Sequence, residues 1–302
     1  MEVQDVMTLI GKPKIEVIEW MQRDGLLSRE MWCHQHEHAI AMRLRRDAGR
    51  NDNYAWRCGT CRRRRSIREG SFFELFRRIE LGHLLALLVF WSLEVKQVTS
   101  SRLLGVSKRS VLEVYNHLSS ICSDDLDRRP LIPFGGPVSI LQIDESKFCG
   151  KRKYNRGRLP RRDNWVFGIV DTSYSPARGY FQVVQRRNRA TLLPIIRRSI
   201  LPGSVVHSDD WGAYTRLQAL EPNVAEHQVV VHRYNFVEPL TGAHTQHIEA
   251  CWSRLKLKIK ERKGVCHFLL QDFLNEQAWR DWRGNGNVFT SFKQLLLERF
   301  QV

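Results

Sequence analysis

Short runs of β-branched and aromatic residues fill the chain after residue 137, and they constrain its fold more than any other feature. Each run ends at turn-forming or charged residues, as strands do. The runs are SILQIDESKF, NWVFGIVDT, RGYFQVVQR, SVVHSDDW and HQVVVHRY. Helical stretches flank the fourth run, ATLLPIIRRSIL before it and AYTRLQAL after it, and HTQHIEACWSRLKLKIKER follows the fifth. Three successive strands, then strands alternating with helices, predict an α/β domain of the RNase H-like class over residues 137–302, with C-terminal helices.

The region before these strands has a helical character. A short helix is expected around Ile15–Met21, and residues 72–127 carry apolar side chains at helical spacing without strand-like alternation. The Pro- and Gly-rich segment DRRPLIPFGGP, residues 127–137, is the predicted linker to the α/β domain.

Two pairs of potential metal ligands lie within residues 31–70. The pairs are Cys33 with His36 and Cys58 with Cys61. Each pair has two intervening residues, and four soft or borderline ligands suit tetrahedral Zn²⁺ in a closed, structural site. His34 and His38 compete with His36 for its position. We therefore predict one structural zinc ion in a ribbon-like, DNA-binding module over residues 1–70, since so polar a segment needs a metal to fold.

The chain is strongly basic: 48 Lys and Arg against 32 Asp and Glu give a formal net charge of +16. A surplus of this size, gathered in clusters, favours nucleic acid as the partner. One cluster directly follows the second ligand pair, and we expect it to contact phosphate. It consists of Arg62, Arg63, Arg64 and Arg65.

The segment VTSSRLLGVSKRSVLEVYNHL has the pattern of a helix-turn-helix and defines a predicted helical domain over residues 71–130. A first helix is expected to end at Gly105, and Ser107 is placed to cap a second helix that begins at Lys108. Lys108 and Arg109 would then lie at the start of a DNA-recognition helix. Its predicted packing face consists of Val111, Leu112, Val114, Tyr115 and Leu118. An ordinary helical hairpin is the alternative.

Acidic residues recur at three points of the predicted α/β domain. Asp144 lies at the solvent end of the first strand, Asp209 and Asp210 lie at the end of the fourth, and Glu249 lies in the first turns of the following helix. Carboxylates at two strand ends and on one helix provide the hard oxygen ligands for two Mg²⁺ ions, or Mn²⁺ ions, in phosphoryl transfer. This set predicts a metal-dependent active site.

Two basic features accompany the acidic set. Lys256 falls on the helix face of Glu249 and Trp252, so we expect it near the metals and available to a substrate phosphate. The block KRKYNRGRLPRR, residues 151–162, follows the first acidic strand and is predicted to clamp a DNA strand. Its candidate DNA-binding residues are Lys151, Arg152, Lys153, Arg156 and Arg158.

Several of these stretches together resemble the Merlin superfamily of DNA transposases, a eukaryotic cut-and-paste group similar to some bacterial insertion-sequence transposases. The matching stretches are WRCGTC with SIREGSFF, IDESKF with KRKYNRGR, NWVFGIVD, HSDDWGAY and GAHTQHIEACWSRLK. The resemblance implies an RNase H-like fold, a Mg²⁺-dependent Asp-Asp-Glu triad, action on terminal inverted repeats, and a homodimer or larger oligomer. The family pattern selects Asp209 over Asp210, and it usually has a second cysteine where this chain has His36.

The expected protein is thus a transposase that binds double-stranded DNA, cleaves transposon ends and joins them to a target. Two other functions stay open: a domesticated DNA-binding or regulatory protein, and a metal-dependent nuclease without strand transfer. Seven scattered cysteines argue against a disulfide framework, and the apolar run Leu84–Leu93 is too short to span a bilayer. We expect a soluble, intracellular protein, located in the nucleus of a eukaryote or in the cytoplasm or nucleoid of a bacterium.

Overall fold

The computed structural model describes residues 3–148, 164–231, 237–239, 241–284 and 286–300. The chain divides into two compact units. The first unit contains Met1–His117 and Arg283–Val302, and the second contains Leu118–Trp282. The long helix α5 (Lys108–Arg128) begins in the first unit and ends in the second. Among the helices of the described residues, none has both the length and the apolar character needed to cross a membrane.

Two small antiparallel sheets follow the N-terminal helices of the first unit. The helices are α1 (Val3–Leu9) and α2 (Lys14–Arg23). The first sheet pairs β1 (Trp32–Cys33) with β2 (Ile40–Ala41). The second has the order β3 (Arg43–Arg46), β4 (Tyr54–Arg57) and β5 (Arg64–Arg65). Strands this short bury little apolar surface, so the sheets depend on other contacts for their stability.

The helical part of the first unit is built around α3 (Leu81–Ser92), whose side chains are buried on every side. The other helices here are the 3-10 helix η1 (Phe72–Phe76), α4 (Gln97–Leu104) and the C-terminal α10 (Val288–Arg299). Helix α10 packs on α3, with the rings of Trp91 and Phe292 4.6 Å apart. The C-terminal helix therefore belongs to the first unit, although the sequence placed it in the α/β domain.

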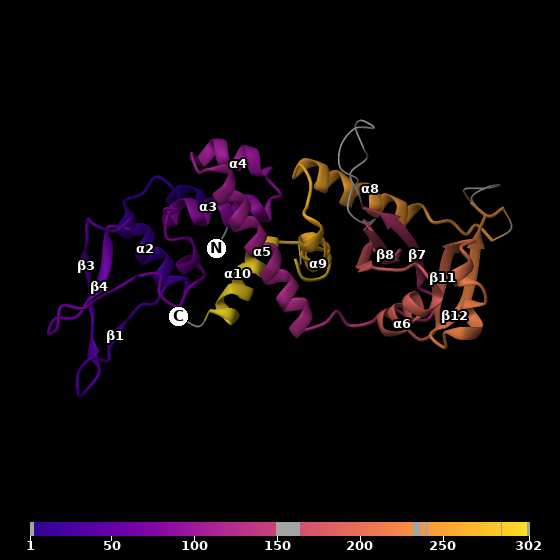
Figure 1. Ribbon diagram of the computed structural model, residues 1–302, viewed down its shortest axis with the longest axis horizontal. Coiled ribbons are helices and arrows are strands. Elements are labelled where there is room, and N and C mark those ends of the chain that lie inside the picture. The colour runs from indigo at the N-terminus through magenta and orange to yellow at the C-terminus, as the bar shows by residue number, and fades with distance from the viewer. Residues whose placement is uncertain (1–2, 149–163, 232–236, 240, 285, 301–302) are drawn as a thin grey trace. The chain divides into compact units, whose positions relative to one another are not determined.

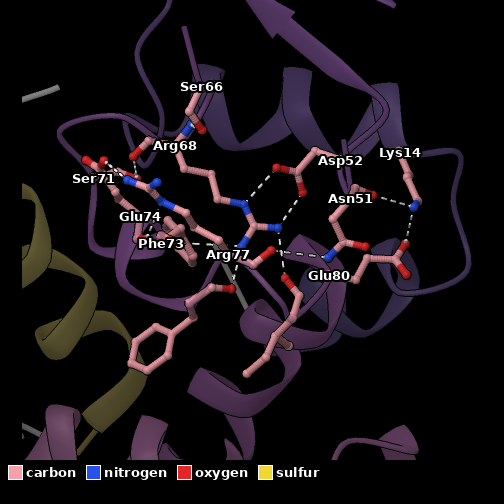
Figure 2. Close-up of polar contacts among 12 residues, drawn as sticks. Lys14, Asn51, Asp52, Ser66, Arg68, Ser71, Phe73, Glu74, Arg77 and Glu80 are labelled. Atoms are coloured by element: carbon pink, nitrogen blue, oxygen red, sulfur yellow. Dashed lines mark hydrogen bonds and ion pairs between the residues drawn. The ribbon is translucent and has the colours of Figure 1, made fainter. Parts of the chain in front are cut away.

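A buried arginine joins the small sheets to the helices (Figure 2). The Arg68 Nε atom donates to Asp52 Oδ2 at 2.7 Å, and Nη2 donates to the second carboxylate oxygen. The remaining donors reach backbone carbonyls, with 2.8 Å from Nη1 to Phe76 O and 2.8 Å from Nη2 to Ile79 O. The hydrogen bonds from Arg68 to Phe76 and Ile79 thus cross the expected domain boundary at residue 70, and residues on both sides of it belong to one unit.

The second unit contains a five-stranded sheet of order β12-β11-β7-β8-β9 (Figure 1). Its strands are β7 (Ile140–Lys147), β8 (Trp165–Asp171), β9 (Arg178–Val184), β11 (Ser204–Asp209) and β12 (Val224–Val230). The first three are antiparallel neighbours, whereas β11 runs parallel to both β7 and β12. The predicted α/β class, with three successive strands before the alternation begins, is confirmed.

Helices cover both faces of this sheet because its side chains alternate between two apolar clusters. One cluster packs the sheet against α6 (Arg189–Ser199) and α7 (Leu217–Leu220). The other packs it against α8 (Gln246–Glu261) and α9 (Leu270–Arg283). The 3-10 helices η2 (Gly212–Tyr214) and η3 (His267–Leu269) complete the unit.

The expected linker at residues 127–137 is part of the second unit. Phe134 is buried in the sheet's core, and strand β6 (Phe134–Gly135) pairs in parallel with β10 (Ile200–Leu201). The Gly136 amide donates to Ser204 Oγ at 2.9 Å. The linker prediction was wrong because Pro and Gly here shape a packed connection, and the units divide within α5 instead.

The predicted helix-turn-helix segment has the expected local elements. Helix α4 stops before Gly105, whose φ of 63° is left-handed, and Ser107 Oγ accepts from the Ser110 amide at 3.1 Å as the cap of α5. Of the predicted packing face, Leu112 is instead 44% exposed, while the other four residues are buried. Whether Lys108 and Arg109, both exposed, contact DNA stays a prediction.

Candidate active site and zinc centre

Asp144 and Asp209 lie on the same face of the sheet. Strands β7 and β11 are paired through His207 and Gln142, where the ladder between them ends. Because side chains alternate along a strand, the residues two positions further on, Asp144 and Asp209, point to the same side as this pair. Asp144 lies within β7, which continues to Lys147, rather than at the strand's end as expected.

Glu249 reaches this face from α8, the helix that packs on it. The Glu249 carboxylate accepts a hydrogen bond from Thr245 Oγ1 at 3.3 Å, within the first turn of the helix. The pKa of Asp144 is raised to about 6, first by burial and further by the negative charges of Asp209 and Glu249. The structure therefore brings the three predicted carboxylates into electrostatic contact.

An indole holds the Asp144 carboxylate in place. Trp252 Nε1 donates to Asp144 Oδ2 at 2.9 Å, which opposes part of the rise in the Asp144 pKa. Gly168, the partner of Asp144 across β7 and β8, makes room for this ring. A Cβ atom at Gly168 would lie 2.6 Å from Trp252 Cη2. Helix spacing predicts that Trp252 lies on the face of Glu249, but it gives no signal for this contact.

A buried glutamine fixes the start of α8. Gln142 Oε1 accepts from the Ile248 amide at 3.1 Å, and its Nε2 lies 3.3 Å from His244 Nδ1. His207 Nδ1 lies 3.4 Å from the His244 carbonyl oxygen. Gln142 and His207 are two positions before Asp144 and Asp209 on their strands, so these polar contacts lie next to the carboxylates. They set the position of Glu249 relative to the sheet.

The two neighbouring aspartates differ in their surroundings. Asp209 is half-buried, and its Oδ1 accepts from the Trp211 amide at 3.1 Å. Asp210 is exposed and follows the last residue of β11. Only Asp209 lies within β11, at a position whose side chain points to the same face of the sheet as Asp144.

Glu145 is a further carboxyl at this end of the sheet, which the sequence analysis did not single out. It points to the opposite face from Asp144 and accepts a short hydrogen bond from the Tyr214 hydroxyl. Burial raises its pKa to about 7, and the charges of Asp144 and Asp209 add to this rise. Neither helix spacing nor a sequence motif gives a signal for Glu145, because its surroundings come from the segment after β11.

Of the predicted basic residues, Lys256 lies beside the carboxylates. Its Nζ donates to Ser146 Oγ at 2.6 Å, and Ser146 is two positions after Asp144 on the same face of β7. The clamp block, with Lys151, Arg152, Lys153, Arg156 and Arg158, lies outside the described residues.

The predicted zinc ligands form a compact cluster in the first unit. Their four ligand atoms all lie within 4.8 Å of one another. Cys33 and Cys61 have their sulfur atoms 3.6 Å apart, and His36 Nε2 lies 3.3 Å from Cys58 Sγ. Within the described part of the chain, this is the group gathered tightly enough to hold an ion, and it contains neither His34 nor His38.

The turn after β4 favours a thiolate. Backbone amides of Cys61 and then Thr60 point at Cys58 Sγ, and with His36 they lower the pKa of Cys58 to about 6. A thiolate is the form that binds metal, so this turn fits a zinc ligand.

A basic groove adjoins the cluster. Residues of both small sheets and of the segment after them line it, among them Trp32, Arg50, Arg63, Arg64, Arg65 and Arg77. Arg64 is paired with Asp47 at 3.3 Å and Arg65 with Glu69, so two of the predicted phosphate contacts already have acidic partners. Arg62 and Arg63 are exposed.

Comparisons with known proteins agree with this site. Residues 137–281 match the family model of the ISXO2-like transposase domain. An uncharacterized transposase-like protein of Haemophilus influenzae is 30% identical over 101 residues, which cover 33% of this chain and 78% of that protein.

Two solved assemblies give weaker matches. A chain of the simian T-cell lymphotropic virus intasome in complex with the PP2A regulatory subunit B56 gamma is 16% identical, with 64% of this chain and 67% of that chain covered and a TM-score of 0.31. The Mos1 transposase paired-end complex with left transposon end is 11% identical, with 72% and 78% covered and a TM-score of 0.28. TM-scores this low do not establish a common fold.

Proposed function

Because the chain belongs to the insertion-sequence-type DDE transposases, we propose that it is a cut-and-paste enzyme that binds terminal inverted repeats, cleaves the DNA ends and joins them to a target. The observation that carries this proposal is the shared face of Asp144, Asp209 and Glu249, where the charges of Asp209 and Glu249 both act on Asp144. The strand order, three antiparallel strands followed by two parallel ones, supports an RNase H-like catalytic domain.

The donor set fits a hard divalent metal. Asp144, Asp209 and Glu249 offer carboxylate oxygens, and a nearby positive charge would offset the burial and the mutual repulsion that raise the pKa of Asp144. Two Mg²⁺ or Mn²⁺ ions held by these residues would activate the attacking oxygen and stabilise the leaving 3′ oxygen.

The chain's own residues prepare this site. Trp252 orients the Asp144 carboxylate, and Gln142 anchors the helix that carries Glu249. Lys256 is a fixed positive charge on the same face, placed to hold a phosphate of the DNA strand. These contacts hold the carboxylates in position before the DNA binds, as electrostatic catalysis requires.

The first unit is proposed to bind DNA. Cys33, His36, Cys58 and Cys61 fit one structural Zn²⁺, since three thiolates and one imidazole make a closed tetrahedral shell. Arg62 and Arg63 are then placed to contact phosphate, and Lys108 and Arg109 to read the terminal repeat. Two ends must meet for joining, so we propose a homodimer or larger oligomer, acting in the nucleus of a eukaryote or the nucleoid of a bacterium.

Incubation with Mg²⁺ and the element's own terminal repeat DNA tests the proposal. We expect strand breaks at the repeat boundary and, with target DNA present, covalently joined products. Breaks without joined products would indicate a nuclease without strand transfer. Binding to the repeat without breaks would indicate a domesticated regulatory protein, and neither binding nor breaks would contradict the proposal altogether.

A further inference from the structure

A guanidinium group lies between two indole rings at the same end of the sheet. Arg187 Cζ is 3.7 Å from the ring centroid of Trp165 and 4.7 Å from that of Trp211. Trp165 is the first residue of β8, Arg187 lies between β9 and α6, and Trp211 follows β11. Both distances are well within cation–π range. We refer to these three residues as the aromatic stack.

The loops that carry the aromatic stack are held firmly. Trp211 Nε1 donates to the Arg187 carbonyl oxygen at 3.0 Å, which fixes the orientation of the indole. Nearby, Arg189 donates to the carbonyl oxygen of Thr215 at 2.9 Å and so ties the start of α6 to the segment after β11. The stack is therefore preorganised, and binding to it costs little conformational entropy.

The aromatic stack adjoins the acidic site. The Trp211 amide donates to Asp209 Oδ1, so the indole is two residues from a proposed metal ligand and is hydrogen-bonded to it. Trp165 packs on the sheet face opposite Asp144, so the stack meets the acidic site through Trp211 and Asp209.

Trp211 is nonetheless 40% exposed. A large aromatic side chain held rigid and open to solvent is poorly explained by packing, because Trp165 and Tyr214 already fill the core on this side. With Arg187 against one face, the exposed part of the indole is a flat surface beside a positive charge. Such a surface binds the face of any nucleobase, and the arginine suits the phosphates attached to it.

We propose that Trp165, Arg187 and Trp211 form a nucleobase-binding subsite, which takes an unpaired base next to the phosphate at the acidic site. The inference rests on the proposed action on DNA and adds a ligand class and a location to it. A base inside a duplex offers no free face, so the subsite selects DNA whose end is frayed or whose base has left the helix.

Fluorescence anisotropy with two labelled DNA hairpins tests the proposal, in buffer without divalent metal so that no strand is cut. One hairpin carries a single unpaired adenine at its 3′ end, and the other carries an abasic residue there. We expect the wild-type protein to bind the adenine form about tenfold more tightly, as stacking on an aromatic side chain typically gives. Trp211→Ala should bind both forms equally.

Trp32→Ala is the matched control, since Trp32 is 41% exposed but lies on β1 in the first unit. It should keep the preference for adenine even if overall affinity falls. Trp211→Phe keeps an aromatic ring and should retain part of the preference, which guards against misfolding of the alanine variant. Equal binding of both hairpins by the wild type, or an unchanged preference in Trp211→Ala, would overturn the subsite. Failure of the wild type to bind either hairpin would instead refute the proposed function, and the subsite with it.

Discussion

The zinc cluster and the acidic site bring charged ligands together in opposite ways. The four predicted zinc ligands come from two tight turns on short strands, and their ligand atoms already lie within 4.8 Å of one another. The acidic residues come from β7, β11 and α8, which a sheet and its buried helices hold in place. In the first case the proposed Zn²⁺ would supply stability that the small sheets lack. In the second case the fold supplies the stability, and concentrated negative charge opposes it.

Removing the zinc should have the largest effect on structure. Cys58→Ala is expected to abolish zinc binding and expose residues 31–70 to protease, because structural zinc contributes on the order of 10 kcal/mol to folding of small modules. Zinc analysis and limited proteolysis measure this. Cys266→Ala, which changes an exposed cysteine outside the cluster, is the control and should keep its zinc. A Cys58→Ala protein with full zinc content would show that the cluster is not the site.

The buried ion pair between Arg68 and Asp52 also stabilises the small sheets of the first unit. Arg68→Met should lower the free energy of unfolding by about 3–5 kcal/mol, because Asp52 would remain buried without its partner. Thermal or denaturant unfolding measures the loss. Arg62→Met, at an exposed arginine of the same region, should leave stability nearly unchanged. Similar small effects for both variants would mean that the two parts of the first unit are joined in some other way.

Removing a charge from the acidic site should raise the stability of the protein, in contrast to the two changes in the first unit. The pKa of Asp144 in the folded protein, about 6, is above its ordinary value of 3.8. The group therefore favours folding while protonated, below pH 4, and this contribution is lost as pH rises through about 6. At pH 7.5 without metal, Asp144→Asn should raise the melting temperature by about 3 °C or more. Asp210→Asn, at an exposed carboxylate, should not, and an equal or lower melting temperature in Asp144→Asn would contradict the account.

Removing the single hydrogen bond between Trp252 and Asp144 should change the structure little but raise the Mg²⁺ requirement for cleavage. Trp252→Phe keeps an aromatic ring but removes the hydrogen bond to Asp144, so we expect the Mg²⁺ concentration for half-maximal cleavage to rise about tenfold or more. Trp282→Phe is a matched control, because it removes an indole hydrogen bond of the same length, 2.9 Å, to the Gly179 carbonyl oxygen. An equal Mg²⁺ requirement in both variants would show that Trp252 does not position Asp144.

The sequence predicted local features better than tertiary ones. The strand runs, the end of α4 at Gly105, the cap at Ser107 and the two ligand turns follow from residues close in the chain, and all are present. The contacts between Gly168 and Trp252 and between Arg68 and Asp52 depend on how distant segments pack. The periodicity of the sequence gives no signal for these contacts. The Pro- and Gly-rich segment at 127–137 was misread for the same reason, since its partner strand β10 lies far along the chain.

Single-turnover cleavage of saturating terminal repeat DNA with Mg²⁺ tests the central claim most directly. Asp144→Ala, Asp209→Ala and Glu249→Ala should each reduce the rate by about 100-fold or more, because each removes a metal ligand and the charge stabilisation it supports. DNA binding should persist, since it depends mainly on Lys and Arg. Asp210→Ala should cleave at close to the wild-type rate. Normal cleavage by any of the three variants, or loss of cleavage in Asp210→Ala with Asp209→Ala active, would contradict the account.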